Sequence, residues 1–329
     1  MSRRPVVIAA AAVAFACFAA PAFAAFPGRD GEIVYTRTDS LGNQTVCSVQ
    51  PRTGRERQLT EVPEQCSRVR AGWFDDVPAY SASGRQIFYS HSGDCGTRGN
   101  PDGLYRVPAA GGSGNVILRD RSLRAAWWPV PAASGARLLF VNDLTISPRR
   151  DPDGYSNTLF SASLTRGRGT RRLSPRGATT DEFPAVGSTG RLAFARDHHQ
   201  LLLGPARGPL PRTGGLRLLT TYRRGEISTP DWSPSGKRIL FARDRHRQGF
   251  HSDLFTIGVR GGDLRRLTRT DDAVSPVWSP SGRRIAFVRA PDDAQPSKGP
   301  LYVMDRDGSH ARKLAQGVDH TRLSWQPLR

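Results

Sequence analysis

Acidic side chains recur in this chain just before short apolar segments, and their spacing could gather them at one site. The chain is strongly basic, with a formal net charge of +19, so a recurrent acidic position is not a by-product of composition. Carboxylates that meet at a narrow opening focus a negative field that attracts a cation, a basic peptide or a partner's N-terminal amine. Alternatively, each carboxylate accepts backbone N–H bonds from a neighbouring loop and ties the fold together. The residues are Asp75, Asp76, Asp181, Glu182, Glu226, Asp271, Asp272 and Asp319, and the corresponding position of one repeat holds Arg124 instead.

Histidines are the second group with chemical potential. His198, His199, His246 and His251 fall in predicted loops on the same side as the carboxylates. Three or more of these ligands converging there would favour a metal-dependent lyase or hydrolase acting on polysaccharide. No histidine forms an H-E-x-x-H pair, and solvated loop histidines are the simpler interpretation. The Asp-x-Asp-Gly stretches at 151–154 and 305–308 resemble the start of a calcium loop, but they lack its glutamate and fit β-turns. We therefore predict no cofactor and assign no metal.

A catalytic nucleophile is not indicated. The sequence contains no G-x-S-x-G elbow and no alternation of strands with helices of the kind that an α/β-hydrolase domain requires. We predict that the chain is not an enzyme.

An internal repeat predicts the elements that position these residues. Residues 228–243 read STPDWSPSGKRILFAR, and residues 275–289 read SPVWSPSGRRIAFVR. Each unit has a segment ending in Trp, a Ser-Pro-Ser-Gly turn and an alternating strand, which is the pattern of two short antiparallel strands. Weaker copies extend toward the N-terminus. The turn glycines recur at intervals of 46 to 55 residues and are Gly84, Gly135, Gly190, Gly236 and Gly282.

Two further strands follow in each repeat, as in DLFTI at 253–257 and LRRLT at 264–268. Four short antiparallel strands per repeat are typical of a β-propeller blade. A sixth repeat is split between the chain ends, because GRDGEIVYTR at 28–37 matches the second strand and LSWQP at 323–327 matches the first. We predict an all-β, six-bladed β-propeller of four-stranded antiparallel blades, closed by N- and C-terminal strands in one blade. This closure leaves no open sheet edge.

The repeat resembles the TolB-type propeller repeat, a relative of the WD repeat. The matching words are PDWSPSGKRILFAR, PVWSPSGRRIAFVR, LYVMDRDG and RRLT, and the likeness covers nearly all of residues 28–329. The family's usual turn is Ser-Pro-Asp-Gly, whereas Ser235 and Ser281 stand at the Asp position here. The resemblance implies protein–protein contact in the cell envelope.

The first 24 residues have the features of a secretory signal peptide. Arg3 and Arg4 precede an apolar run, and an A-x-A cleavage motif ends at Ala24. The alternative is an uncleaved anchor. We predict that residues 25–329 form a single propeller domain, secreted or held in the periplasm or cell envelope, and that the protein is a monomer.

Three cysteines remain after residue 24. Cys47 occupies a third-strand position and is expected to be a buried, inert thiol. Cys66 and Cys95 lie in loops that open on the same face of a propeller, which predicts a Cys66–Cys95 disulfide among the three possible pairings.

The positive charge is carried almost wholly by arginine and is spread through every repeat. No nucleic-acid-binding motif accompanies it, so we expect no nucleic-acid function. An anionic cell-wall polymer is a further expected partner.

These observations favour a non-catalytic protein-binding or scaffolding module with a protein or peptide partner in the cell envelope. Its partner surface is expected on the side of the acidic residues, where the longest loops (90–102, 144–157, 243–252 and 290–299) project. Trp73, Trp127 and Trp128 stand near the acidic residues and either line that site or pack in the core.

Overall fold

The computed structural model describes residues 26–70, 72–93, 102–118, 126–145, 155–165, 169–177, 180–245, 251–290 and 298–329. All regular secondary structure within these ranges is β-strand, which confirms the all-β prediction for this part of the chain. No helix of these ranges is long and apolar enough to cross a membrane.

Four of the sheets have four antiparallel strands each, joined in sequence order. Each pairs a first strand with a second across a tight turn, then adds a third and a fourth outward. The strands are β8 (Ala126–Pro131), β9 (Arg137–Thr145), β10 (Tyr155–Ser163) and β11 (Thr170–Arg172); β12 (Asp181–Val186), β13 (Arg191–Arg196), β14 (Gln200–Pro205) and β15 (Arg217–Thr221); β16 (Ile227–Trp232), β17 (Arg238–Asp244), β18 (Ser252–Gly258) and β19 (Arg265–Arg266); and β20 (Ala273–Trp278), β21 (Arg284–Arg289), β22 (Lys298–Asp305) and β23 (Arg312–Asp319).

The remaining sheet has eight strands and consists of two four-stranded units. One unit is β24-β1-β2-β3 and the other is β4-β5-β6-β7. The two units are joined by a single parallel pairing of Gln44 in β2 with Phe74 in β4. The strands are β1 (Arg29–Thr38), β2 (Gln44–Val49), β3 (Glu56–Gln58), β4 (Phe74–Tyr80), β5 (Gln86–Ser92), β6 (Gly103–Pro108), β7 (Asn115–Leu118) and β24 (Ser324–Leu328).

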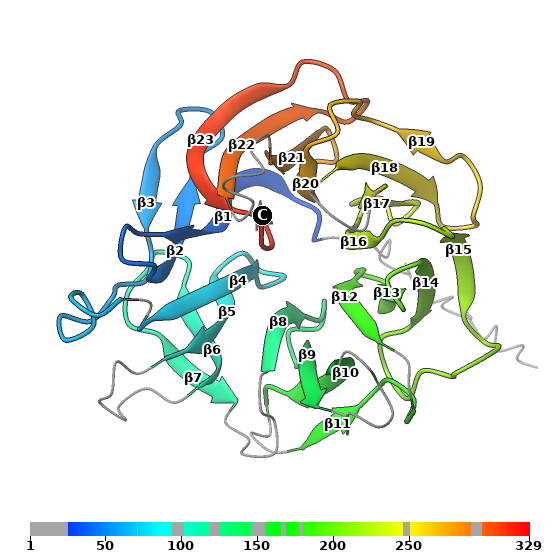
Figure 1. The fold of residues 1–329 in the computed structure, drawn as a ribbon, viewed down its shortest axis with the longest axis horizontal. Helices are drawn as coiled ribbons and strands as arrows, with labels where there is room; N and C mark the ends of the chain where they lie inside the picture. Colours follow the sequence, from blue (N-terminus) through cyan, green and yellow to red (C-terminus); the bar gives the residue numbers. More distant parts are fainter. Residues whose placement is uncertain are drawn as a thin grey trace, which may run out of the picture.

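The four-stranded units stand around a common axis, with β4, β8, β12, β16 and β20 nearest the centre and β3, β7, β11, β15 and β23 toward the rim (Figure 1). Apolar side chains fill the spaces between neighbouring units. One cluster joins β13 and β14 to β16–β18 through Phe241, for example, and another joins β17 and β18 to β20–β22 through Trp278. Sheet-on-sheet packing, not any single sheet, therefore supplies the hydrophobic core.

The repeated Ser-Pro-Ser-Gly segments form the predicted turns. Gly236 and Gly282 have φ angles of 67° and 68°, a left-handed conformation that costs glycine little. Ser233 accepts the amide hydrogen of Gly236 on its carbonyl oxygen at 2.8 Å, and its hydroxyl accepts that of Arg238 at 3.0 Å. Ser235, at the Asp position of the family's turn, places its hydroxyl 3.1 Å from that of Ser233. The bonds that close the turn come from Ser233, so they do not need Asp at position 235.

The two chain ends pair as the split repeat predicted. β24 runs antiparallel to β1, with Ile33 opposite Trp325 and Arg29 opposite Leu328. The indole nitrogen of Trp325 donates to the carbonyl oxygen of Gly31 at 3.1 Å. The innermost strand of this unit therefore comes from the C-terminus and the next from the N-terminal part of the chain.

The inner strands share a strained backbone feature that is not evident from apolar patterning. In β4, β8, β12, β16 and β20, the pairing with the second strand shifts at one point, as in a β-bulge. The residue at that shift has φ between 46° and 58° although it is not glycine, and a proline follows it. A bulge leaves one backbone N–H without a partner in the neighbouring strand. Proline has no backbone N–H, so it can occupy this position without leaving a donor unsatisfied. The pairs are Val77-Pro78, Trp128-Pro129, Phe183-Pro184, Thr229-Pro230 and Ser275-Pro276.

A glycine substitution at this bulge should separate the effect of backbone strain on stability from the effect of side-chain packing. Thr229 is β-branched, buried and at φ 46°, and its hydroxyl has no hydrogen-bond partner among the described residues. Left-handed backbone in a non-glycine residue costs about 1 kcal/mol or more, so Thr229→Gly should leave the urea unfolding midpoint at or above that of the parent.

The control is Thr256→Gly in β18, where the side chain is also buried but accepts a hydrogen bond from Arg238. It should lower the midpoint, because glycine weakens an ordinary strand. Equal losses in both variants would contradict a strained bulge.

Candidate functional site at the channel mouth

The predicted carboxylates lie where the inner strands begin. Asp75 and Asp76 are the second and third residues of β4. Asp181 is the first residue of β12, and Asp272 directly precedes β20. Asp319 ends β23 and leads toward β24. We call this end of the inner strands the channel mouth, and the opposite end, which carries the Ser-Pro-Ser-Gly turns, the turn face.

Three of the mouth carboxylates are buried against an arginine or a histidine from the second strand of their own unit. Asp181 is fully buried and pairs through both oxygens with Arg196, at 2.6 and 3.0 Å. Asp272 pairs with Arg289 through one oxygen, at 2.6 and 2.7 Å, and its other oxygen is buried without a partner among the described residues. This differs from the expectation that backbone amides of neighbouring loops would hold these groups. The reason is the strand register, which sets Asp181 directly opposite Arg196.

Asp75 has histidine in place of arginine. Its carboxylate lies 2.7 Å from Nδ1 of His91 and accepts a hydrogen bond from the indole of Trp73 at 3.1 Å. His91 is 3% exposed and its ring packs against those of Trp73 and Tyr105, at centroid distances of 4.3 and 5.0 Å. Trp73 therefore packs in the core beside the mouth, and the Asp75–His91 pair lies beneath the surface, out of reach of a large ligand.

A second pair of carboxylates meets across the seam where the chain ends close. Asp76 accepts a hydrogen bond from Thr36 at 2.8 Å, and Asp319 accepts one from Thr38 at 2.6 Å. Both threonines are on β1, so this strand of the closing unit holds a carboxylate from each neighbour. A contact between a mouth carboxylate and the neighbouring unit was expected, but the donors are threonine side chains and not backbone amides. Asp319 also accepts from Gln44 at 3.2 Å, and its other oxygen is buried without a partner among the described residues.

Burial gives Asp319 an unusual affinity for protons. Desolvation raises its pKa to about 6, with the nearby Asp76 adding to the rise and the hydrogen bond from Thr38 opposing it. Burial likewise raises the pKa of Asp76, against hydrogen bonds from Thr36 and Val77. Two acids therefore share one poorly solvated corner of the mouth.

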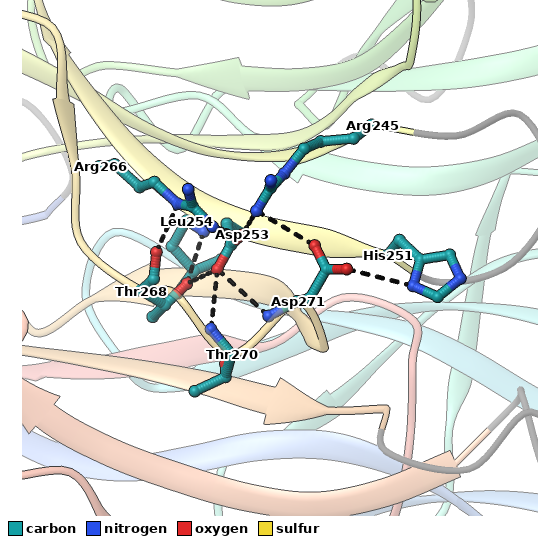
Figure 2. A network of polar contacts seen from close by, with 8 residues as sticks. All are labelled: Arg245, His251, Asp253, Leu254, Arg266, Thr268, Thr270 and Asp271. Carbon is teal, nitrogen blue, oxygen red and sulfur yellow. Dashed lines mark hydrogen bonds and ion pairs between the residues drawn. The ribbon is translucent and has the colours of Figure 1, made fainter.

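Asp271 belongs to a network on the other side of the mouth (Figure 2). Its carboxylate lies 3.2 Å from Arg245 and 3.3 Å from His251, and its side chain is 43% exposed. Asp253 anchors the network from beneath. It is fully buried on β18 and binds Arg245 and Arg266 through one oxygen and Thr268 through the other. Burial raises the pKa of Asp253, but the hydrogen bonds from these donors outweigh that effect and lower its pKa below the ordinary value.

Glu182, His198 and Glu226 form a third group, between β12 and β16. Nδ1 of His198 lies 3.0 Å from Glu182, and this hydrogen bond raises the pKa of His198 against its partial burial, with Glu226 contributing. Glu226 is exposed. The nearest cation in register, Arg243, lies instead over the ring of Tyr222, 3.7 Å from its centroid. Glu226 and Asp271 are thus the mouth carboxylates that solvent reaches.

A narrow cavity of about 60 Å³ lies between the inner strands, along the halves that lead to the turn face, and no mouth carboxylate lines it. It has room for a few water molecules but not for a large ligand. Two charged groups that sequence reasoning missed line it, Asp231 on β16 and Arg322 just before β24. Burial raises the pKa of Asp231 to about 6 and lowers that of Arg322 to about 10. Asp231 accepts the amide hydrogen of Trp278 at 2.7 Å, and Arg322 donates to the carbonyl oxygen of Pro129 at 3.0 Å.

The other predicted residues are placed as follows. Cys47 is a free, buried thiol, as predicted. Trp128 lines the cavity and Trp127 packs beside it. Within the described ranges, no three His, Cys, Asp or Glu side chains are arranged to hold a metal ion. His246, Cys95, Arg124, residues 1–25 and the stretch 151–154 lie outside the described residues, so the Cys66–Cys95 disulfide stays a prediction.

Four-stranded antiparallel sheets standing radially around a central cavity define a β-propeller. Comparison with solved structures agrees. TolB from Acinetobacter baumannii superposes with a TM-score of 0.65 at 16% identity over 90% of this chain and 67% of that one. A putative TolB from Agrobacterium tumefaciens gives 0.62 at 18% identity over 89% and 92%. An oligogalacturonate lyase from Vibrio parahaemolyticus gives 0.55 at 12% identity over 89% and 79%.

The fold is therefore a TolB-like β-propeller. No protein-family model matches the chain, and no curated protein matches it. At these identities the likeness concerns the fold alone.

Breaking the buried pair at the mouth should be costly. Asp181→Asn leaves Arg196 buried opposite a neutral side chain, and loss of one partner of a buried pair costs about 3–5 kcal/mol. We expect the free energy of unfolding in urea to fall by that order. Asp263→Asn, which removes the exposed carboxylate that pairs with the half-buried Arg238 and the exposed Arg265, should leave it nearly unchanged. A similar small change in both variants would contradict a structural role for Asp181.

Asp319 should make stability depend on pH. Its folded pKa of about 6 exceeds the ordinary value of 3.8, so the folded state holds the proton more tightly than the unfolded state. Its contribution is fully present below pH 4 and is lost as the pH rises through 6. Asp319→Asn should therefore stabilise the protein by roughly 1 to 3 kcal/mol at pH 8, with the gain vanishing toward pH 4.

Denaturant unfolding across this pH range measures the effect. The control Glu226→Gln should change stability little at either pH, because that side chain is exposed. A gain that is the same at pH 4 and pH 8 would contradict the assignment to Asp319.

Proposed function

We propose that this protein is a six-bladed TolB-like propeller that serves as a non-catalytic binding module in the cell envelope. Counting the eight-stranded sheet as two blades gives six units of four strands. Six hydrophobic clusters support the count, because each fills the space between one unit and the next around the ring. The signal-like residues 1–24 and the TolB-like fold favour a secreted or periplasmic location.

The observation that carries this proposal is the division of the mouth carboxylates. Asp75, Asp181 and Asp272 are buried against basic side chains of their own units, so they can hold the blades in place but cannot meet a partner. Glu226 and Asp271 reach solvent on one side of the mouth, beside the partly exposed His198 and His251. These groups lie in short connections between strands, and the cavity between the inner strands is too narrow for a substrate. Both features favour surface recognition of a cationic partner segment.

A lysine-rich peptide with a free N-terminal amine is the probe for this surface. Titration calorimetry at low salt should show binding that Glu226→Gln combined with Asp271→Asn weakens about tenfold or more, since each removes a charge from the accessible set. The matched control is Asp307→Asn, an exposed carboxylate on the turn face, which should leave the affinity unchanged.

Equal weakening by the mouth and control variants would contradict a mouth site. Solved structures with this fold include lyases as well as TolB, so the same protein should also be tested for metal content and for cleavage of anionic polysaccharide. A stoichiometric transition metal with such cleavage would overturn the non-catalytic proposal.

A further inference from the structure

The turn face carries two adjoining hollows lined by arginines. One, of about 400 Å³, lies between the blade of β20–β23 and the closing unit. The other, of about 560 Å³, lies between the blade of β16–β19 and that of β20–β23. Both include Ser281 of the β20–β21 turn, so together they form one shallow groove across three blades. Arginines contribute four of the nine residues that line the first hollow and four of the thirteen that line the second. They are Arg29, Arg52, Arg283 and Arg284, and Arg238, Arg265, Arg266 and Arg306.

Four of these arginines have a polar partner in the structure, and the other four have no ion pair within the described ranges. Arg238 and Arg265 pair with Asp263, Arg266 pairs with Asp253, and Arg29 donates to a carbonyl oxygen of Arg329. The side chains of Arg52, Arg283, Arg284 and Arg306 form no ion pair with any residue that the structure describes. Arg52, Arg283 and Arg284 line the first hollow, and Arg306 lines the second.

The acidic residues that line the groove do not neutralise these arginines. Asp30 accepts hydrogen bonds from the backbone amide and the hydroxyl of Ser281, at 2.9 and 3.0 Å. Asp307 accepts those of Ser309, at 3.0 and 2.6 Å, and these bonds lower its pKa. Both carboxylates are thus used to shape turns. The amide of Arg306 donates to the carbonyl oxygen of Arg283 at 3.0 Å, which fixes two of the free arginines on adjacent turns.

We propose that this groove binds a flexible anionic chain whose repeating units carry phosphate or carboxylate groups. Guanidinium groups bind both anions through paired N–H donors. Several of them spaced along a shallow groove suit a ligand that repeats its charge. A protein partner would be expected to meet apolar or aromatic anchors at the centre of the contact, whereas arginine is the most frequent residue type in the lining of each hollow. The proposal does not depend on the channel-mouth function, because it concerns the opposite face.

Inorganic polyphosphate is the probe, titrated into the protein at several salt concentrations. The unsubstituted protein should bind it, and Arg283→Gln combined with Arg306→Gln should raise Kd about tenfold or more at low salt. The slope of log Kd against log salt should fall by about two, since two anion contacts are lost. Both side chains are at exposed turns, and unchanged circular dichroism would verify that the variant is folded.

The matched control is Arg223→Gln combined with Arg224→Gln, two exposed arginines in the loop before β16 on the mouth face. This variant loses the same charge and should keep the affinity within about threefold of the parent. Equal weakening by the two variants would overturn the proposal, because net charge alone would then explain binding. Binding to phosphatidylglycerol vesicles without binding to soluble polyphosphate would also overturn it, by placing the ligand in a bilayer.

Discussion

The antiparallel pairing of β24 with β1 is the constraint on which the rest of the molecule depends. Each unit of four short strands is too small to bury its apolar faces alone, and it does so only between two neighbours. A ring satisfies this condition for every unit, whereas an open array would leave two faces and two edges bare. The pairs Ile33–Trp325 and Val34–Ser324 supply the missing contact. They also bring β1 between Asp76 and Asp319, so the same closure builds one corner of the mouth.

The inner strands position the carboxylates of the channel mouth within that ring. Their bulges place residues such as Thr229 and Ser275 in left-handed backbone around the cavity. Carboxylates recur at the same end of these strands, some buried and some exposed. Where a cation lies opposite in register, as Arg196 does, the acid becomes part of the framework. Where the cation is engaged elsewhere, as Arg243 is over Tyr222, the acid stays available to solvent. Local differences between otherwise equivalent repeats therefore decide which positions can bind a partner.

The sequence alone predicted the strands, the turns and the pairing of the chain ends, because all three recur with the repeat. It also predicted that the carboxylates share one end of the inner strands. It did not predict their partners, since the Asp181–Arg196 pair depends on strand register and the Asp76–Thr36 contact depends on which units meet. The bulges had a readable signal in the recurrent prolines, such as Pro230 and Pro276. Arg322 was missed because the last repeat diverges there and replaces the X-Pro pair with Arg-Leu.

The pairing of β1 with β24 has one more consequence. Arg29 and Leu328 are neighbours across a strand pair, so the ring of blades does not depend on the chain being open at this particular point. A short linker between these ends, with a new opening at an exposed turn such as that around Gly54, would yield a circular permutant with every inter-blade contact retained. In such a permutant the β24–β1 hairpin would become a local contact, and the pairing of β2 with β3 would close the ring instead.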